Sequence, residues 1–293
     1  MISEMCMQCL MDRQQKKAAG ITDETKRREF LKELERVITQ REPEASVPVL
    51  SARLNGYYAT NVGEVEDYSQ IKRQYNQLVM DMEPKLLERI ERDKDPLRLA
   101  LILARIGNYI DFGIMREVET SVLEQMLRSA DRDTLDEKVY EQFLKELEHA
   151  DSLVYLPDNC GEVVLDKLVI QKIKERYPKL KVTAIVRGKD VVNDATREDA
   201  VMVGLDLIAD RLLDNGTQIG GTYLPELSIE SRQAIQETDL ILAKGQGNFE
   251  TMNGCGLNVY YLFLCKCDWF VQRFDLPRNT GVFIREKDLD WAV

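Results

Sequence analysis

The stretch LVYLPDNCGEVVLDKLVIQKIKERYPKLKVTAIVRG (153–188) decides the fold of the second half of the chain. It opens with a short apolar run, 153–159, that stops at a polar turn. A segment with the pattern of a helix follows at 162–178, and a second apolar run, rich in β-branched residues, spans 181–188. Strand, helix and strand in this order predict a parallel βαβ unit with the helix packed on the sheet.

The same alternation continues to the end of the chain. Further apolar runs of strand length lie at 239–245, 257–265 and 281–284, and helix-like stretches begin near Arg197 and span 230–236. Short apolar strands that alternate with amphipathic helices indicate a mostly parallel sheet covered on both faces. We therefore predict an α/β/α domain over residues 151–293.

The first half of the chain has helical periodicity throughout. Apolar residues recur at spacings of three and four, which is the spacing of a buried helix face. The predicted helices are one capped by Thr22, one at 68–92, one that begins at Pro96, one at 117–129 and one at 136–149. The predicted fold class is α/β, with an all-helical N-terminal domain over residues 1–150.

Charge and composition narrow the function classes. The 293 residues include 40 Lys and Arg against 51 Asp and Glu, which gives a formal net charge of −11. Such a surface repels a polyphosphate backbone or an anionic membrane, so neither nucleic acid nor membrane is expected as a partner. No apolar run is long enough to span a bilayer. Six cysteines without a disulfide-type spacing favour a reducing compartment, and we expect a cytoplasmic protein.

Polar side chains follow the predicted strands at the edge of the sheet where ligands bind. Asp158 and Asn159 come after the first strand, and Asp194 follows the second. Two carboxylates and a carboxamide are ligands suited to Mg²⁺ or Mn²⁺. The alternative is that Asp158 or Asn159 caps the next helix. Backbone amides at Gly161 and Glu162, where that helix begins, suit a phosphate oxygen.

Two further loops carry candidate binding residues. Lys244 leaves a strand and precedes Gly245, and an ammonium group beside glycines suits a phosphoryl oxygen, with a surface lysine as the alternative. Arg187 ends the second strand and is a candidate substrate-binding residue.

Cys6 and Cys9 form a lone CxxC, which is weak evidence for zinc or redox chemistry.

Six segments then resemble one known family in the same order. These segments are CMQCLMDRQ (6–14), GNYIDF (107–112), LPDNCGEVVLDK (156–167), VVNDAT (191–196), DNGTQIGGT (214–222) and AKGQGNFET (243–251). The chain resembles the damage-control phosphatases, formerly domain of unknown function 89, over nearly its whole length. The early CxxC and the compact length are similar to the stand-alone prokaryotic branch.

The resemblance implies a helical domain over a Rossmann-like α/β/α domain and a metal-dependent phosphatase. The implied cofactor is a divalent ion (Mn, Mg, Co or Ni), and the implied substrates are small phosphorylated metabolites, such as sugar phosphates or phosphopantetheine-type compounds. Asp158, Asn159 and Asp194 match the family's metal ligands, and Lys244 matches its phosphate-contacting lysine. Two more positions, Asn108 and Asp111, match the motif of the helical domain that faces the cleft.

The mechanism that these residues predict is metal-assisted hydrolysis of a phosphomonoester. The ion polarises a phosphoryl oxygen, and Lys244 together with amides near Gly161 and Gly245 offsets the developing charge. Glu162 or Asp194 is the candidate to position water. An S-adenosylmethionine-dependent protein carboxyl methyltransferase is one alternative, although the first loop, PDNCGE, has a single glycine. A non-catalytic metal-dependent metabolite or nucleotide sensor is the other.

Overall fold

The computed structural model describes residues 2–63, 66–111 and 119–289. Within these ranges the centre of the molecule is a six-stranded sheet of order β3-β2-β1-β4-β5-β6, in which β6 alone is antiparallel. Its strands are β1 (Ser152–Leu156), β2 (Lys181–Val186), β3 (Arg211–Asp214), β4 (Leu240–Lys244), β5 (Val259–Leu264) and β6 (Gly281–Arg285). The strand order reverses between β1 and β4, so their carboxyl ends flank the crevice where such sheets bind ligands.

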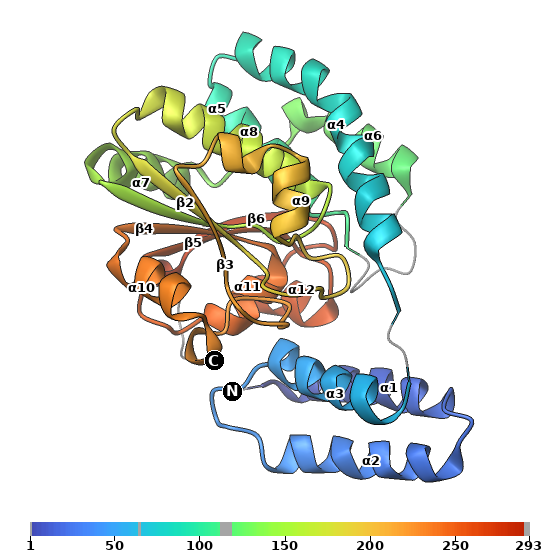
Figure 1. The fold of residues 1–293 in the computed structure, drawn as a ribbon. Helices are drawn as coiled ribbons and strands as arrows, with labels where there is room; N and C mark the ends of the chain where they lie inside the picture. Colours follow the sequence, from blue (N-terminus) through green and yellow to red (C-terminus); the bar gives the residue numbers. More distant parts are fainter. Residues whose placement is uncertain (1, 64–65, 112–118, 290–293) are drawn as a thin grey trace.

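Helices cover both faces of the sheet (Figure 1). One face carries α4 (Ser69–Arg92), α5 (Pro96–Gly107), α6 (Thr120–Arg128), α7 (Glu137–His149), α8 (Glu162–Arg176) and α9 (Arg197–Met202). The other face carries α10 (Ile229–Glu237), α11 (Gly245–Met252) and α12 (Asp268–Phe274). Leu153 and Tyr155 of β1 belong to the first core, whereas Val154 and Leu156 belong to the second. This is the pattern of a strand buried on both sides, and it confirms the predicted α/β/α layers.

The N-terminal helices divide into two groups. Helices α1 (Glu4–Ala19), α2 (Glu24–Thr39) and α3 (Val47–Asn61) form a separate unit next to α11 in Figure 1. It has two small cores, and the larger one also includes Ile219 and Tyr223 from the loop after β3. In contrast, α4 to α7 share one continuous core with α8 and the sheet. The last helix before the sheet, α7, ends at His149, but packing joins 69–149 to the sheet and leaves only the first three helices as a separate unit.

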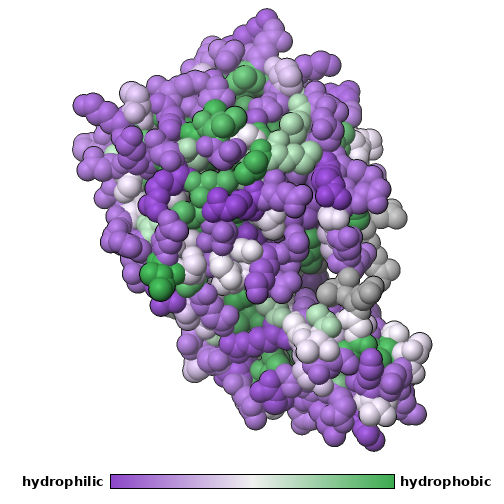
Figure 2. Space-filling model, viewed as in Figure 1, coloured by the Kyte–Doolittle hydropathy of each residue, from purple (hydrophilic) through white to green (hydrophobic). Residues whose placement is uncertain are grey.

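Most predicted elements lie where the sequence placed them, and β3, α3, α11 and α12 are among those that were not predicted. Strand β3 is a short edge strand with two charged residues, and α3, α11 and α12 contain Gly, Asn or mixed sequence that lacks a clear helical stripe. The first two residues of the helix expected at 117–129, and Phe112 of the GNYIDF segment, lie outside the described residues. Among the described residues, no helix is long and apolar enough to cross a membrane. Hydrophilic residues cover most of the face seen in Figure 2.

Candidate active site

The loops after β1 and β2 bring the three predicted metal ligands together. Asp158 and Asn159 follow β1 directly, and Asp194 lies in the loop after β2. The two loops pair through their backbones: the Cys160 N–H donates to the Asn193 carbonyl at 2.8 Å, and Asn159 and Asp194 form an antiparallel bridge. All three side chains line one cavity of about 260 Å³. The spacing of these three residues in the sequence does not by itself bring them together. Their proximity depends on the loop after β2, which folds back onto the loop after β1.

Arg187 lies between the two carboxylates. Its Nε donates to Asp194 Oδ2 at 2.6 Å, and its Nη2 donates to Asp158 Oδ1 at 3.4 Å. The side chain is only 1% exposed, and its Nη1 is buried without a hydrogen-bond partner among the described residues. A buried donor without a partner is costly, so such an atom commonly marks the place of a ligand or water. The guanidinium group thus orients Asp158 and Asp194, and the N–H groups of its Nη1 remain for a ligand.

A buried carboxylate, Glu162, fixes the amides of the site. The Nδ2 atom of Asn159 donates to Glu162 Oε2 at 3.0 Å and to Asp158 Oδ2 at 2.8 Å. Asn108 donates to the same two carboxylates at 3.0 Å, and its own oxygen accepts the Leu264 N–H at 3.1 Å. Because the nitrogen of Asn159 is bound on this side, its oxygen is the atom that remains for a ligand in the cavity.

Lys244 has two carboxylate partners inside the protein. Its Nζ lies 2.5 Å from Glu162 Oε1, 2.8 Å from Asp166 Oδ1 and 3.0 Å from the Ala104 carbonyl. The side chains of Lys244, Glu162 and Asp166 are all fully buried. An ammonium group has three hydrogens, and three acceptors are present. The contact between Lys244 and phosphate that the sequence suggested stays a prediction, whereas the contacts seen in the structure orient Glu162.

The site holds more negative than positive charge. Burial is the first cause that raises the pKa of Asp158 well above its usual range, and the charges of Asp194 and Glu162 raise it further. Arg187 and Lys266 act in the opposite direction. Burial also raises the pKa of Asp194, which Arg187 partly offsets. Carboxylates that are desolvated and close together favour an added cation.

Two glycines allow close backbone approach, but in different ways. Gly245 begins α11 with a φ of +78°, and a Cβ at this position would lie 1.9 Å from Asp158 Oδ2. The strand end of β4 therefore lies directly against the loop that carries Asp158. Gly161 also has a positive φ, +71°, and its amide donates to Asn76 Oδ1 at 2.6 Å. That amide, expected to donate to a phosphate oxygen, thus already has a partner from α4.

Asp111 reaches the cavity from the segment that follows α5. Helix α5 ends at Gly107, so Asn108 and Asp111 do not share a helix face; they extend from the residues after it. Asp111 Oδ2 accepts from Lys266 Nζ at 2.6 Å, and Asp111 lines the same cavity as Asp158. Lys266 is 3% exposed and lies two residues after the carboxyl end of β5. This lysine was not among the predicted site residues, although it follows a strand end as Lys244 does.

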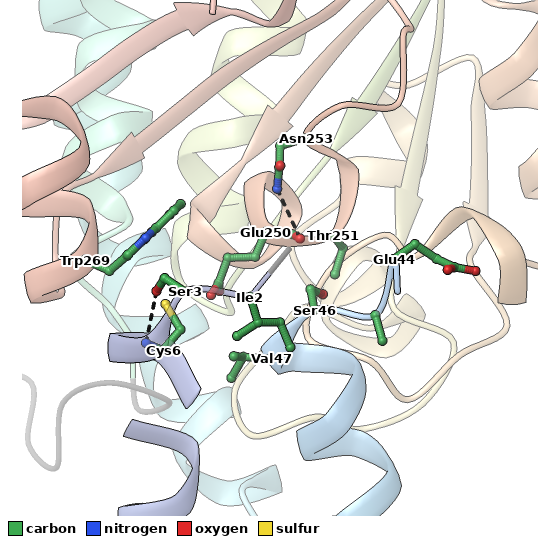
Figure 3. A pocket seen from close by; sticks show the side chains of 11 residues that line it. Ile2, Ser3, Cys6, Glu44, Ser46, Val47, Glu250, Thr251, Asn253 and Trp269 are labelled. Carbon is green, nitrogen blue, oxygen red and sulfur yellow. Dashed lines mark hydrogen bonds between the residues drawn. The ribbon is translucent and has the colours of Figure 1, made fainter. Parts of the chain in front are cut away.

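A second cavity adjoins the first on the other side of α11. It has a volume of about 270 Å³ and lies between the start of α1, the residues before α3 and α11. Figure 3 shows Glu250 of α11 directed into it, close to Cys6 and opposite Val47. Glu250 lines both cavities, and burial raises its pKa to about 7. Cys6 and Cys9 are free thiols of α1.

The donor set fits a hard divalent ion. In the described parts of the chain, no three Asp, Glu, His or Cys side chains are arranged to hold a metal. The candidate set instead combines two carboxylates, Asp158 and Asp194, with the Asn159 amide oxygen, and a set of oxygen atoms alone suits Mg²⁺ or Mn²⁺. The structural observation that agrees with a cation there is that these three oxygen-bearing side chains line one cavity.

Comparison with known proteins assigns the family. The sequence profile of the "Damage-control phosphatase ARMT1-like domain" matches residues 2–280. The chain belongs to the damage-control phosphatase family. It is 34% identical to a damage-control phosphatase of Archaeoglobus fulgidus over 96% of each chain, and 33% identical to damage-control phosphatase PH1575 of Pyrococcus horikoshii over 71% of each.

A solved structure agrees with this assignment. The crystal structure of a DUF89 family protein from Pyrococcus horikoshii superimposes with a TM-score of 0.77 and 25% identity, over 97% of this chain and 98% of that one. The resemblance to damage-control phosphatases is therefore confirmed, and the fold predicted from the sequence is confirmed with it. Membership of this family supports a phosphatase activity.

Proposed function

We propose that this damage-control phosphatase hydrolyses small phosphomonoesters with a divalent metal ion held by Asp158, Asn159 and Asp194. The observation that carries the proposal is that these three side chains line one cavity beside the carboxyl ends of β1 and β2. Arg187 binds two of them, and its Nη1 has no hydrogen-bond partner among the described residues. An ion of Mn, Mg, Co or Ni would polarise a phosphoryl oxygen and lower the pKa of a water molecule. The family assignment supports this activity.

Each remaining residue has a role that its contacts support. Arg187 Nη1 donates to a phosphoryl oxygen, where a donor already in place stabilises the charge that develops as the P–O ester bond breaks. Glu162 holds the Asn159 amide in the orientation that presents its oxygen. Asn108 donates to Glu162 and Asp158, and Lys244 holds Glu162. These three are positioning residues, because they act through the groups that contact substrate or metal.

The proposed substrates are small phosphorylated metabolites, such as sugar phosphates or phosphopantetheine-type compounds. A cavity of about 260 Å³ beside Asp158 and Asp194 admits a phosphoryl group with a short alcohol part. Water adds to phosphorus, the P–O bond to the alcohol breaks, and the alcohol leaves with a proton. Free cysteines at all six positions fit a reducing compartment such as the cytoplasm, where we expect this hydrolysis to take place.

The test is phosphate release from a panel of phosphomonoesters with Mn²⁺ and after exhaustive chelation. We expect turnover that disappears with the metal and returns when it is added back. Asp194→Ala should abolish both turnover and Mn²⁺ binding measured by calorimetry, because it removes one of three ligands. Asp206→Ala, an exposed carboxylate away from the cavity, is the matched control and should behave as the wild type.

Three results contradict the proposal. Full activity after chelation refutes the metal requirement, and wild-type Mn²⁺ affinity in Asp194→Ala refutes the ligand set. If Mn²⁺ binds with normal affinity but no ester of the panel releases phosphate, the sensor alternative replaces the enzyme.

A further inference from the structure

Two buried glutamines line the cavity with polar atoms that lack partners. Gln246 is 4% exposed, and within the described residues neither its Oε1 nor its Nε2 has a hydrogen-bond partner. Gln14 is 6% exposed, and its Oε1 is likewise without a partner there. Burying such atoms unpaired is unfavourable, and native proteins rarely do so without a ligand or water to pair with them. Neither glutamine has a part in the catalytic arrangement described above.

The two side chains line the cavity from two elements that are far apart in the sequence. Gln246 lies in the first turn of α11, directly after Gly245, whose backbone contacts Asp158. Gln14 lies on α1, in the separate N-terminal unit. Both line the cavity that contains Asp158 and Asp194. A phosphoryl group at the metal-ligand loop would therefore have the rest of its molecule between α1 and α11.

The unpaired atoms define the chemistry that fits them. Gln246 offers one donor and one acceptor at the end of one amide, a pair that two neighbouring hydroxyl groups match, one accepting and the other donating. Gln14 Oε1 adds a second acceptor. Asp111 and Glu250 line the same cavity and would repel a negative charge on the alcohol part of the substrate. Arg13 also lines the cavity and partly offsets the charge of Glu250. These features together favour a neutral alcohol with adjacent hydroxyl groups over an anionic or purely apolar one.

We propose that Gln246 of α11 and Gln14 of α1 form a subsite for the alcohol part of the substrate and select phosphoesters with a vicinal diol. This inference rests on the proposed phosphatase function, because it takes the phosphoryl group to lie at Asp158 and Asp194. It makes the α1–α3 unit part of the substrate-binding wall, whereas the metal-ligand set comes from the sheet loops alone.

The binding test compares two ligands that cannot be hydrolysed and that differ in the hydroxyl groups. They are 2,3-dihydroxypropylphosphonate and propylphosphonate, titrated by calorimetry into the Mn²⁺-loaded protein. We expect the wild type to bind the diol roughly tenfold to hundredfold more tightly, which is the range for two neutral hydrogen bonds. Gln246→Leu should reduce this preference to about twofold or less, and Gln14→Leu should reduce it in part.

Gln218→Leu is the matched control. Gln218 lines the same cavity, but it is exposed and its Nε2 donates to the Asp190 carbonyl at 2.8 Å. The diol preference should persist in this variant. Because Gln14 and Gln246 lie on different elements, folding failure of one variant leaves the other as a test.

Turnover separates this inference from the proposed function. The ratio of kcat/KM for glycerol 1-phosphate to that for propyl phosphate should fall in Gln246→Leu as the binding preference does. A wild type without diol preference, or variants that keep it, overturns the subsite even if both esters are hydrolysed. If neither ester is hydrolysed while the binding preference is present and lost in Gln246→Leu, the subsite is supported and the phosphatase proposal fails.

Discussion

Lys244→Met removes an ammonium group that contacts two buried carboxylates. Its Nζ lies 2.5 Å from Glu162 Oε1 and 2.8 Å from Asp166 Oδ1, and all three side chains are fully buried. In the wild type these groups carry two negative charges and one positive charge. The methionine keeps an unbranched chain of similar length, so the main change is that both carboxylates lose their cation.

The expected loss of folding stability is large. Removing one partner of a buried ion pair costs about 3–5 kcal/mol, because the other charge stays buried without compensation. Here two carboxylates share the cation, so we expect the loss near the upper end of that range. A lysine that served only to contact phosphate would behave in the opposite way: replacing a buried cation without carboxylate partners would leave the unliganded protein as stable or more stable.

The loss should also depend on pH. Burial raises the pKa of Asp166 to about 6, even though Lys244 acts to lower it. Without Lys244 that pKa rises further, so the folded state binds a proton that the unfolded chain has already released. Folding stability then decreases as the pH rises through and above 6. The difference between variant and wild type should therefore be larger at pH 8 than at pH 5.

Urea unfolding followed by circular dichroism at both pH values measures this difference. Lys174→Met is the matched control, because Lys174 forms a partly exposed ion pair with Asp210 at 2.9 Å. That variant should lose about 0.5 kcal/mol or less. The reasoning is refuted if Lys244→Met loses no more stability than Lys174→Met, or if its loss is the same at pH 5 and pH 8.

Two other substitutions test the site. Gly245→Ala should weaken Mn²⁺ binding at least tenfold in calorimetry, because the added Cβ would meet Asp158 Oδ2. Gly254→Ala, at nearly the same φ but in open space, should retain full affinity, and equal affinities in the two variants would contradict the close contact. Asp111→Asn should change the order of kcat/KM across a phosphomonoester panel while Mn²⁺ affinity stays normal, because the Lys266 ion pair weakens at the cavity wall; a uniform decrease for all substrates would confine Asp111 to structure.

The sequence by itself determined the layers and most of the elements. Apolar runs such as 153–156 are buried on both faces and read as parallel strands, because each residue in them avoids water whichever way it points. The rule that ligands lie at the carboxyl ends of such strands predicts Asp158 and Asn159 as site residues from the sequence alone. The edge strand β3 was not predicted, because the charged residues Arg211 and Asp214 at its two ends leave only a short apolar run between them.

Only the tertiary structure decided which polar groups meet. Lys244 reads as a strand-end cation, but its partners Glu162 and Asp166 lie about eighty residues away on α8, one helical turn apart. Gln14 and Gln246 come together because the α1–α3 unit docks beside α11, far from it in sequence. The spacing of apolar residues along one helix or strand determines which side chains of that element become buried. The pairing of buried polar atoms is set by the docking of separate elements, which no local spacing encodes.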